Sequence, residues 1–360
     1  MSDSPTPKVR TGQGPEKIDK AAFAHRFKAR FHDPAFDAQS ASIDALLDIA
    51  WDAYQGSRKS PRTRKAGAEF ADPDYDLAIE WLEARAAIHA AQTRYADPAR
   101  PRRILLVIGS PRNDKTCPGE NSKSFRLAEL ARTTIEDAGI ECDVLDLSVT
   151  TSEYGRTIHP CKACVSTAMP LCHWPCSCYP NHSLGQTNDW MNELYPRWVA
   201  AHGILIVTPT HWLQAPAALK LMIDRLVCAD GGNPDPTTTQ GKHAALAKRI
   251  ELDGWDYPRH LEGRVFALVV HGDTEGVRAL RRSLVDWLSA MSLVQAGNHG
   301  VLDRYIGYYK PYASSHEALD RDHDLMEEVR NTARSLVEAV RSARPDVAEP
   351  GKDLKDPRPK

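Results

Sequence analysis

Small hydroxyl residues and one arginine stand where an apolar, strand-like run gives way to a helix-like segment. The run Ile104–Ile108 ends in the turn Gly-Ser-Pro-Arg (109–112), and Asn-Ser-Lys-Ser (121–124) opens an amphipathic segment. The N–H groups at a helix start, together with hydroxyl and guanidinium groups, form a binding site for an anion. We therefore expect a phosphate monoester to be held by Ser110, Arg112, Ser122 and Ser124.

The turn does not match the common nucleotide loops. It has one glycine before the residues 113–120, which separate its two halves, and no Gly-Lys-Ser/Thr ending. This excludes a P-loop and a dinucleotide GxGxxG turn. A simpler interpretation is that Asn121 and Ser122 only cap the helix. Capping alone leaves Ser110 and Arg112 unexplained, so phosphate binding is the stronger hypothesis.

A second group of reactive side chains is a cysteine cluster. Five of the eight cysteines lie within eighteen residues, as Cys161-x2-Cys164-x7-Cys172-x3-Cys176-x-Cys178. Such short spacings indicate metal binding or redox chemistry more often than a disulfide framework in a chain expected to be cytoplasmic. A zinc site and a metal-free packed loop both remain open on the residues alone.

Alternating strand and helix patterns must position these residues. We expect strands near 103–109, 142–147, 203–208, 264–271 and 293–297, and helices near 122–138, 189–201, 215–227, 275–291 and 315–342. Five parallel strands joined by helices form a doubly wound α/β sheet, whose ligands bind at the carboxyl ends of the strands. The segment 148–188 is longer than an ordinary connection, which favours a functional role for it.

The flanking regions differ in composition from this α/β part. Residues 1–17 and 346–360 are polar and predict disordered tails, 18–100 predicts a helical extension with a basic loop at 58–65, and 313–345 predicts a carboxyl-terminal helix. The basic loop is typical of a solvated surface, with an anion site as the alternative.

Charge and hydropathy exclude several classes of partner. The 46 Lys and Arg nearly balance the 48 Asp and Glu, so net charge favours neither nucleic acid nor a membrane surface as a partner. We find no secretory signal pattern and no apolar run of bilayer length. These features predict a cytoplasmic protein.

In its motifs the chain resembles the flavodoxin-like NAD(P)H-dependent FMN reductases, including their iron–sulfur flavoprotein relatives. The resemblance rests on the turn 109–112 with 121–124, on 189–194 leading into 203–212, and on the helix-like segment 215–225. It covers roughly 103–300, and it implies a five-stranded flavodoxin-like FMN-binding domain at 101–312 with an added N-terminal extension. The loop 113–120 is an apparent insertion, and nothing carries over to residues before 100.

The resemblance also implies roles for particular residues. The FMN phosphate would be held by the residues named above together with Asn121, and the flavin ring would be framed by Thr208, Pro209, Thr210, His211, Trp212, His271, Gly272 and Asp273. FMN itself carries hydride, so no side chain is expected to act as nucleophile or strong base. The alternative for the segment at 208–214 is a surface loop with one packed tryptophan.

The resemblance implies partners as well. NAD(P)H would be the co-substrate, the acceptor would be a small molecule such as a quinone or free flavin, and the chain would form a homodimer. Relatives with a compact cysteine motif in this region hold a [4Fe–4S] cluster, which adds iron–sulfur to zinc and metal-free packing as a possibility for Cys161, Cys164, Cys172, Cys176 and Cys178. The first CxxC matches that motif, but the later spacing is wider.

Two other functions remain open on the sequence. One is a flavodoxin-type electron carrier without its own substrate site, and the other is a metal-stapled interaction protein that has lost its flavin. The near-neutral charge and large extra segments disfavour the carrier, and the intact phosphate turn disfavours the interaction protein.

Overall fold

The strand that precedes the predicted phosphate turn is an inner strand of a parallel sheet. The computed structural model describes residues 10, 12–14, 17–226, 232–255 and 259–342. The chain divides into two units: the first contains Met1–Arg85, Lys162–Asp189 and Gly232–Asp256, and the second contains Ala86–Cys161, Trp190–Gly231 and Tyr257–Lys360. Apart from residues 10, 12–14 and 17, the tails predicted at 1–17 and 346–360 lie outside the described residues.

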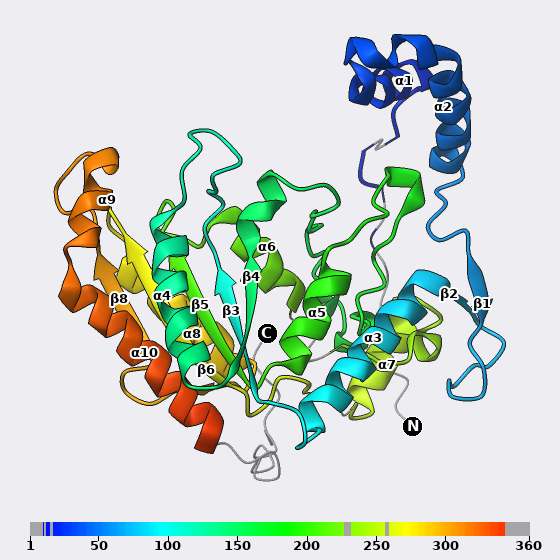
Figure 1. Cartoon of the computed structure of the whole chain (residues 1–360). Coiled ribbons are helices and arrows are strands. Elements are labelled where there is room, and N and C mark those ends of the chain that lie inside the picture. Colours follow the sequence, from blue (N-terminus) through cyan, green and yellow to red (C-terminus); the bar gives the residue numbers. More distant parts are fainter. Residues whose placement is uncertain (1–9, 11, 15–16, 227–231, 256–258, 343–360) are drawn as a thin grey trace. The chain divides into compact units, whose positions relative to one another are not determined.

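The sheet of the second unit is doubly wound, as the sequence predicts (Figure 1). Its strands pair in parallel in the order β4-β3-β5-β6, with β7 and β8 both beside β6. Counted along the chain, this is the 2-1-3-4-5 order of flavodoxin-like folds. The strands are β3 (Arg103–Ile108), β4 (Glu141–Asp146), β5 (Gly203–Pro209), β6 (Val265–Gly272), β7 (Val294–Gln295) and β8 (Val301–Tyr305).

The last strand position differs from the prediction. Among the described residues the sheet has six strands rather than five, because two short strands share the edge beside β6. β7 pairs with the first residues of β6, from Val265, and β8 pairs with its later residues, from Leu268. The predicted strand at 293–297 therefore covers β7 only, and β8 is missed.

Helices cover both faces of this sheet. One face packs against α4 (Lys123–Asp137) and α10 (His323–Ser342) in a single apolar core. The other face meets α5 (Met191–Ala200) and α8 (Val277–Ala290), whose Trp198 and Trp287 rings are in contact. Two further helices, α6 (Ala217–Leu226) and α9 (Tyr312–Asp320), follow β5 and β8. The helix predicted at 315–342 is thus two helices.

The first unit is assembled from three separate stretches of chain. Trp81 donates its indole N–H to the carbonyl of Pro175, and the Asp235 carboxylate accepts the N–H of Ala71. Its elements are α1 (Lys20–Lys28), η1 (Ala29–Phe31), η2 (Pro34–Gln39), α2 (Ser40–Gln55), β1 (Thr63–Lys65), β2 (Asp76–Ala78), η4 (Cys164–Ser166), η5 (Met169–Leu171), η6 (His182–Leu184), η8 (Pro236–Thr239) and α7 (Ala244–Leu252). α3 (Ile79–Ala96) runs from this unit into the second, and η3 (Leu147–Thr151) belongs to the second.

The region 18–100 is not wholly helical. An antiparallel pair, β1 with β2, lies between α2 and α3, and the basic loop 58–65 ends in β1. The compact first unit also includes the cysteine-rich stretch and 232–256, whereas the predicted extension stops at 100. Within the described residues, no helix is both long and apolar enough to cross a membrane.

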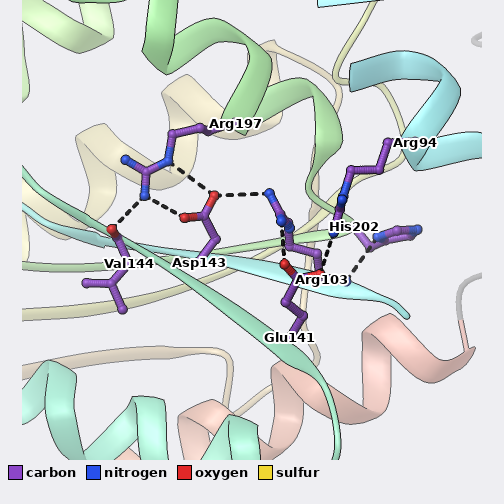
Figure 2. Close-up of polar contacts among 7 residues, drawn as sticks. All are labelled: Arg94, Arg103, Glu141, Asp143, Val144, Arg197 and His202. Atoms are coloured by element: carbon purple, nitrogen blue, oxygen red, sulfur yellow. Dashed lines mark hydrogen bonds and ion pairs between the residues drawn. The ribbon is translucent and has the colours of Figure 1, made fainter. Parts of the chain in front are cut away.

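At the amino ends of the strands, opposite the predicted phosphate turn, a network of charges joins four elements of the second unit (Figure 2). Arg103 bonds to both Glu141 and Asp143 across β3 and β4. Arg94 from α3 donates to Glu141 over 2.7 Å, and Arg197 from α5 donates twice to Asp143, over 2.6 and 3.1 Å. The network therefore ties two helices to the edge of the sheet.

We expect Glu141→Gln to lower the free energy of unfolding by about 1–2 kcal/mol, because it leaves half-buried arginines without one of their charged partners. Burial raises the pKa of Glu141, but the bonds from Arg103 and Arg94 outweigh it, so the net pKa is lowered. The stabilisation is therefore fully present at pH values above the pKa that Glu141 has in the unfolded chain. It is lost as the pH falls through the lower pKa that Glu141 has in the folded chain.

The measurement is urea unfolding of both proteins at pH 7 and pH 4. The difference between variant and parent should shrink at the lower pH. Glu136→Gln on the exposed side of α4 is the control, and it should change stability by less than about 0.5 kcal/mol. An equal effect of the two substitutions would contradict a special role for the network.

Candidate functional site

A cavity of about 500 Å³ opens at the carboxyl ends of β3, β5 and β6. This is the sheet edge at which doubly wound folds bind ligands, and the volume lies in the range of small-molecule sites. Its lining residues all belong to the second unit: Ser110, Pro111, Arg112, Thr116, Cys117, Ser122, Lys123, Ser124, Thr151, Pro209, Thr210, His211, His271, Gly272, Asp273, Ile306 and Tyr312.

The predicted phosphate turn forms one wall of this cavity. Ser122 is the N-cap of α4, and its Oγ accepts the N–H of Phe125 over 3.1 Å. The Oγ of Ser110 likewise accepts the N–H of Arg112 over 3.2 Å. The capping interpretation is thus correct for Ser122, yet each hydroxyl still has its own proton to donate into the cavity.

Two cations accompany these hydroxyls. The guanidinium of Arg112 lies 4.3 Å from the ring centre of Tyr312 and 3.4 Å from the Glu120 carboxylate. Lys123 is 4% exposed, and its Nζ donates to the carbonyl of Ile306 over 2.9 Å. Burial lowers the pKa of Lys123 against the attraction of Asp273. The wall is therefore suited to an anion.

A histidine from β6 links the phosphate turn to the opposite wall. His271 is buried, and its Nε2 lies 2.8 Å from the Oγ of Ser124. Burial, together with Lys123 and His211, lowers the pKa of His271 to about 3, so the ring is neutral at pH 7. A neutral imidazole orients the Ser124 hydroxyl without adding charge.

The segments after β5 and β6 form the second wall. The N–H of Thr210 donates to the His271 carbonyl over 2.8 Å, which holds the two segments together. The buried Oγ1 of Thr210 has no hydrogen-bond partner within the described part of the chain. At Gly272 a Cβ would lie 3.0 Å from Val277, so a side chain there would crowd the start of α8. Thr210 therefore offers the cavity an unused polar atom.

Three of the predicted site residues do not line this cavity. Asn121 precedes α4 and is exposed to solvent. Thr208 is fully buried. Trp212 is 94% exposed at a tight turn in which His211 and Gln214 exchange backbone bonds, and it lines a neighbouring hollow instead. The structure thus places ten of the thirteen predicted residues around one cavity.

Two lining residues, Thr116 and Cys117, were not singled out from the sequence. They come from the loop 113–120, which is anchored where the Asn113 amide donates to Ser148 and Ser152. The unusual length of that loop was the available signal. Ile306 and Tyr312 lie in the aromatic-rich segment 305–312, for which the sequence suggests a lining of the substrate side, a dimer contact or ordinary packing, and both line the cavity.

The cysteine cluster lies mostly in the first unit, with Cys161 in the second. The Sγ atoms of Cys164 and Cys178 are 3.7 Å apart. The hydrogen bond with Cys164 raises the pKa of Cys178, the hydrogen bond with Cys176 opposes it, and burial adds to the net rise. In the described chain no group of three or more Cys, His, Asp or Glu side chains is arranged to hold a metal ion. Iron–sulfur and zinc binding stay predictions.

Comparison with known proteins adds to this geometry. An iron-sulfur flavoprotein from Methanosarcina thermophila is 26% identical over 125 residues, which are 35% of this chain and 52% of that protein. The chain thus spans about half the length of that relative. Two solved structures align with this chain at 14% identity: RosB with a bound riboflavin-phosphate intermediate, and an apo NADH:FMN oxidoreductase. The RosB alignment has a TM-score of 0.45 and covers 67% of this chain and 79% of RosB. The oxidoreductase alignment has a TM-score of 0.39 and covers 68% of this chain and 92% of that protein.

The strongest of the comparisons is with a family as a whole. The model of the NADPH-dependent FMN reductase family matches residues 102–305, more than half of the 360. That range contains β3 to β8 and all the cavity residues except Ile306 and Tyr312. The chain therefore belongs to the NADPH-dependent FMN reductase family.

Proposed function

We propose that the chain binds FMN in the cavity at the sheet edge, takes hydride from NAD(P)H, and passes it to a small acceptor such as a quinone or a free flavin. The observation that carries the proposal is that two cations, three serine hydroxyls and the start of α4 converge on one cavity. A charge-complementary site of this kind suits a phosphate monoester on a larger ligand. We further propose a cytoplasmic homodimer.

The residues present fit such a ligand at both ends. The Oγ atoms of Ser110 and Ser122 each accept one backbone N–H, and each hydroxyl keeps a proton that it can donate to a phosphate oxygen. Arg112 supplies the charge-assisted bond, and the N–H groups in the first turn of α4 add theirs. The position of the phosphate would therefore be fixed by β3 and α4 together.

The other wall suits a polar ring edge. The unpartnered Oγ1 of Thr210 can donate or accept one hydrogen bond, and the buried site makes leaving it unused costly by about 1–3 kcal/mol. Gly272 lines the same wall, and a Cβ there would lie 3.0 Å from Val277 at the start of α8. When bound, FMN accepts and delivers hydride. The chain's own task is to bind and orient it and to leave one side accessible.

The first experiment is an anaerobic absorption spectrum of the purified full chain loaded with FMN, before and after addition of NADPH or NADH. Bound flavin that bleaches with either nucleotide, and recovers with a quinone, supports the proposal. Bound flavin that neither nucleotide reduces would instead favour an electron carrier. A chain that takes up no FMN would refute the proposal.

We expect Arg112→Met to weaken FMN binding about 10–100-fold, because it removes a charge-assisted hydrogen bond worth about 1.5–3 kcal/mol. Binding is measured by titration of flavin fluorescence. Riboflavin lacks the phosphate, so its affinity should change little. Arg132→Met is the matched control, because that guanidinium bonds to Glu129 on the same helix and does not line the cavity. An equal loss for riboflavin would contradict a phosphate contact.

We expect His271→Gln to make the protein less sensitive to acid. The unfolded histidine has a pKa of about 6.5, and the folded one is lowered to about 3, so the unfolded state binds more protons between these values. Stability therefore falls as pH drops below about 6.5. Replacing the ring should remove about 2 kcal/mol of the stability difference between pH 7.5 and pH 5.0.

Glutamine reaches as far as Nε2, so the bond to Ser124 can persist without a titrating group. Urea unfolding at the two pH values measures the effect, with His25→Gln on α1 as the control. If the variant and its parent lose the same stability on acidification, the buried neutral histidine is not responsible.

A further inference from the structure

Two cysteines of the first unit have their sulfur atoms in contact. Cys164 begins η4 and Cys178 lies fourteen residues later, with 3.7 Å between the two Sγ atoms. A disulfide bond is about 2.05 Å long, so a small movement of either side chain would join them. Cys178 is buried, and Cys164 is half-buried at the edge of a small apolar cluster. Cys164 is therefore the more accessible of the two.

A lysine lies beside this pair. The Nζ of Lys242 is 3.8 Å from the Sγ of Cys164 and donates to the carbonyl of Leu171 over 2.5 Å. The carbonyl holds the ammonium in place, so its position near the sulfur does not depend on a freely moving side chain. An adjacent cation favours the thiolate, which is the nucleophilic form of cysteine.

The two simpler roles account for these facts less well. Apolar packing explains a buried cysteine but not an ammonium group fixed beside one. The Cys176 thiol also interacts with that of Cys178, but among the described residues no group of three or more such side chains is arranged to hold a metal ion. A pair of sulfurs in contact next to a cation is the arrangement of a dithiol that exchanges with disulfides.

We propose that Cys164 and Cys178 are a redox-active dithiol pair that a small-molecule disulfide oxidises to an intramolecular disulfide. The Cys164 thiolate attacks one sulfur of the disulfide RSSR, the S–S bond breaks, and the first RS⁻ leaves. Cys178 then gives up its proton and attacks the Cys164 sulfur of the mixed disulfide, which releases the second RS⁻. Two cysteine thiols are oxidised, and one RSSR becomes two RSH with the two protons released.

The test uses the reduced full chain, oxidised glutathione as the disulfide, and N-ethylmaleimide to block the remaining thiols. We expect two fewer blocked thiols per chain, and a peptide map that links Cys164 to Cys178. Cys178→Ser should stop after the first step and carry glutathione on Cys164. Cys142→Ser, on β4 of the second unit, is the control and should still form the disulfide.

The role of Lys242 is tested separately, by measuring the rate at which the disulfide forms. Lys242→Met should slow formation of the disulfide about threefold, because the smaller thiolate population is partly offset by the greater nucleophilicity of each thiolate. Lys65→Met removes an exposed charge from β1 of the same unit, where it pairs with Asp76, and should leave the rate unchanged. The wild-type peptide map does not depend on any variant folding.

Other outcomes overturn the proposal. A disulfide from Cys178 to Cys176 or Cys161, or no disulfide at all, would contradict the pairing. Stoichiometric iron or zinc in the purified protein, lost in Cys164→Ser, would show that these thiols are metal ligands. The flavin site is not involved, so each result is independent of the proposed reductase function.

Discussion

The close approach of β3 and β5 at Gly109 is the constraint on which the cavity depends. A Cβ at Gly109 would lie 2.5 Å from Thr208 Oγ1 and 2.9 Å from Leu219 Cδ2, distances that real Cβ atoms do not adopt. The glycine N–H still pairs with the Val207 carbonyl, so the ladder continues for one residue beyond β3. The phosphate turn and the segment after β5 therefore leave the sheet at adjacent points.

The two edges of the sheet serve different purposes. The carboxyl edge carries polar groups aimed into a cavity, among them an unpartnered hydroxyl at Thr210. The amino edge carries the arginine and carboxylate network, in which the groups satisfy one another across four elements. The ion pairs of the amino edge join β3 and β4 to α3 and α5 (Figure 2).

Local sequence patterns predicted the central sheet well but not its margins. Runs such as Ile104–Ile108 are apolar throughout, since both faces of the strand are covered, and this signal is unambiguous. β8 was missed because it is short and partly exposed, so no strong alternation marks it. Thr208 was predicted to contact a ligand, yet its burial beneath Gly109 depends on how two strands pack, which one segment cannot reveal.

The same limit applies to the site and the first unit. Ser110, Ser122 and Arg112 follow from local turn and capping chemistry, so the sequence identifies them. Tyr312 reaches the cavity from a segment some two hundred residues later, and only the tertiary fold brings it there. The association of 162–189 with residues before 86 is likewise a long-range fact that no local pattern encodes.

The interleaving of the two units affects the order in which the chain can fold during synthesis. The first unit needs Met1–Arg85, Lys162–Asp189 and Gly232–Asp256, so it stays incomplete until residue 256 has been made. By then β3, β4 and β5 have already emerged. At about 5–20 residues per second, helices α1 and α2 would wait roughly 10–40 s for the remaining segments of their unit. During that interval its apolar side chains are available to chaperones, and removing either unit by a single truncation would also cut into the other.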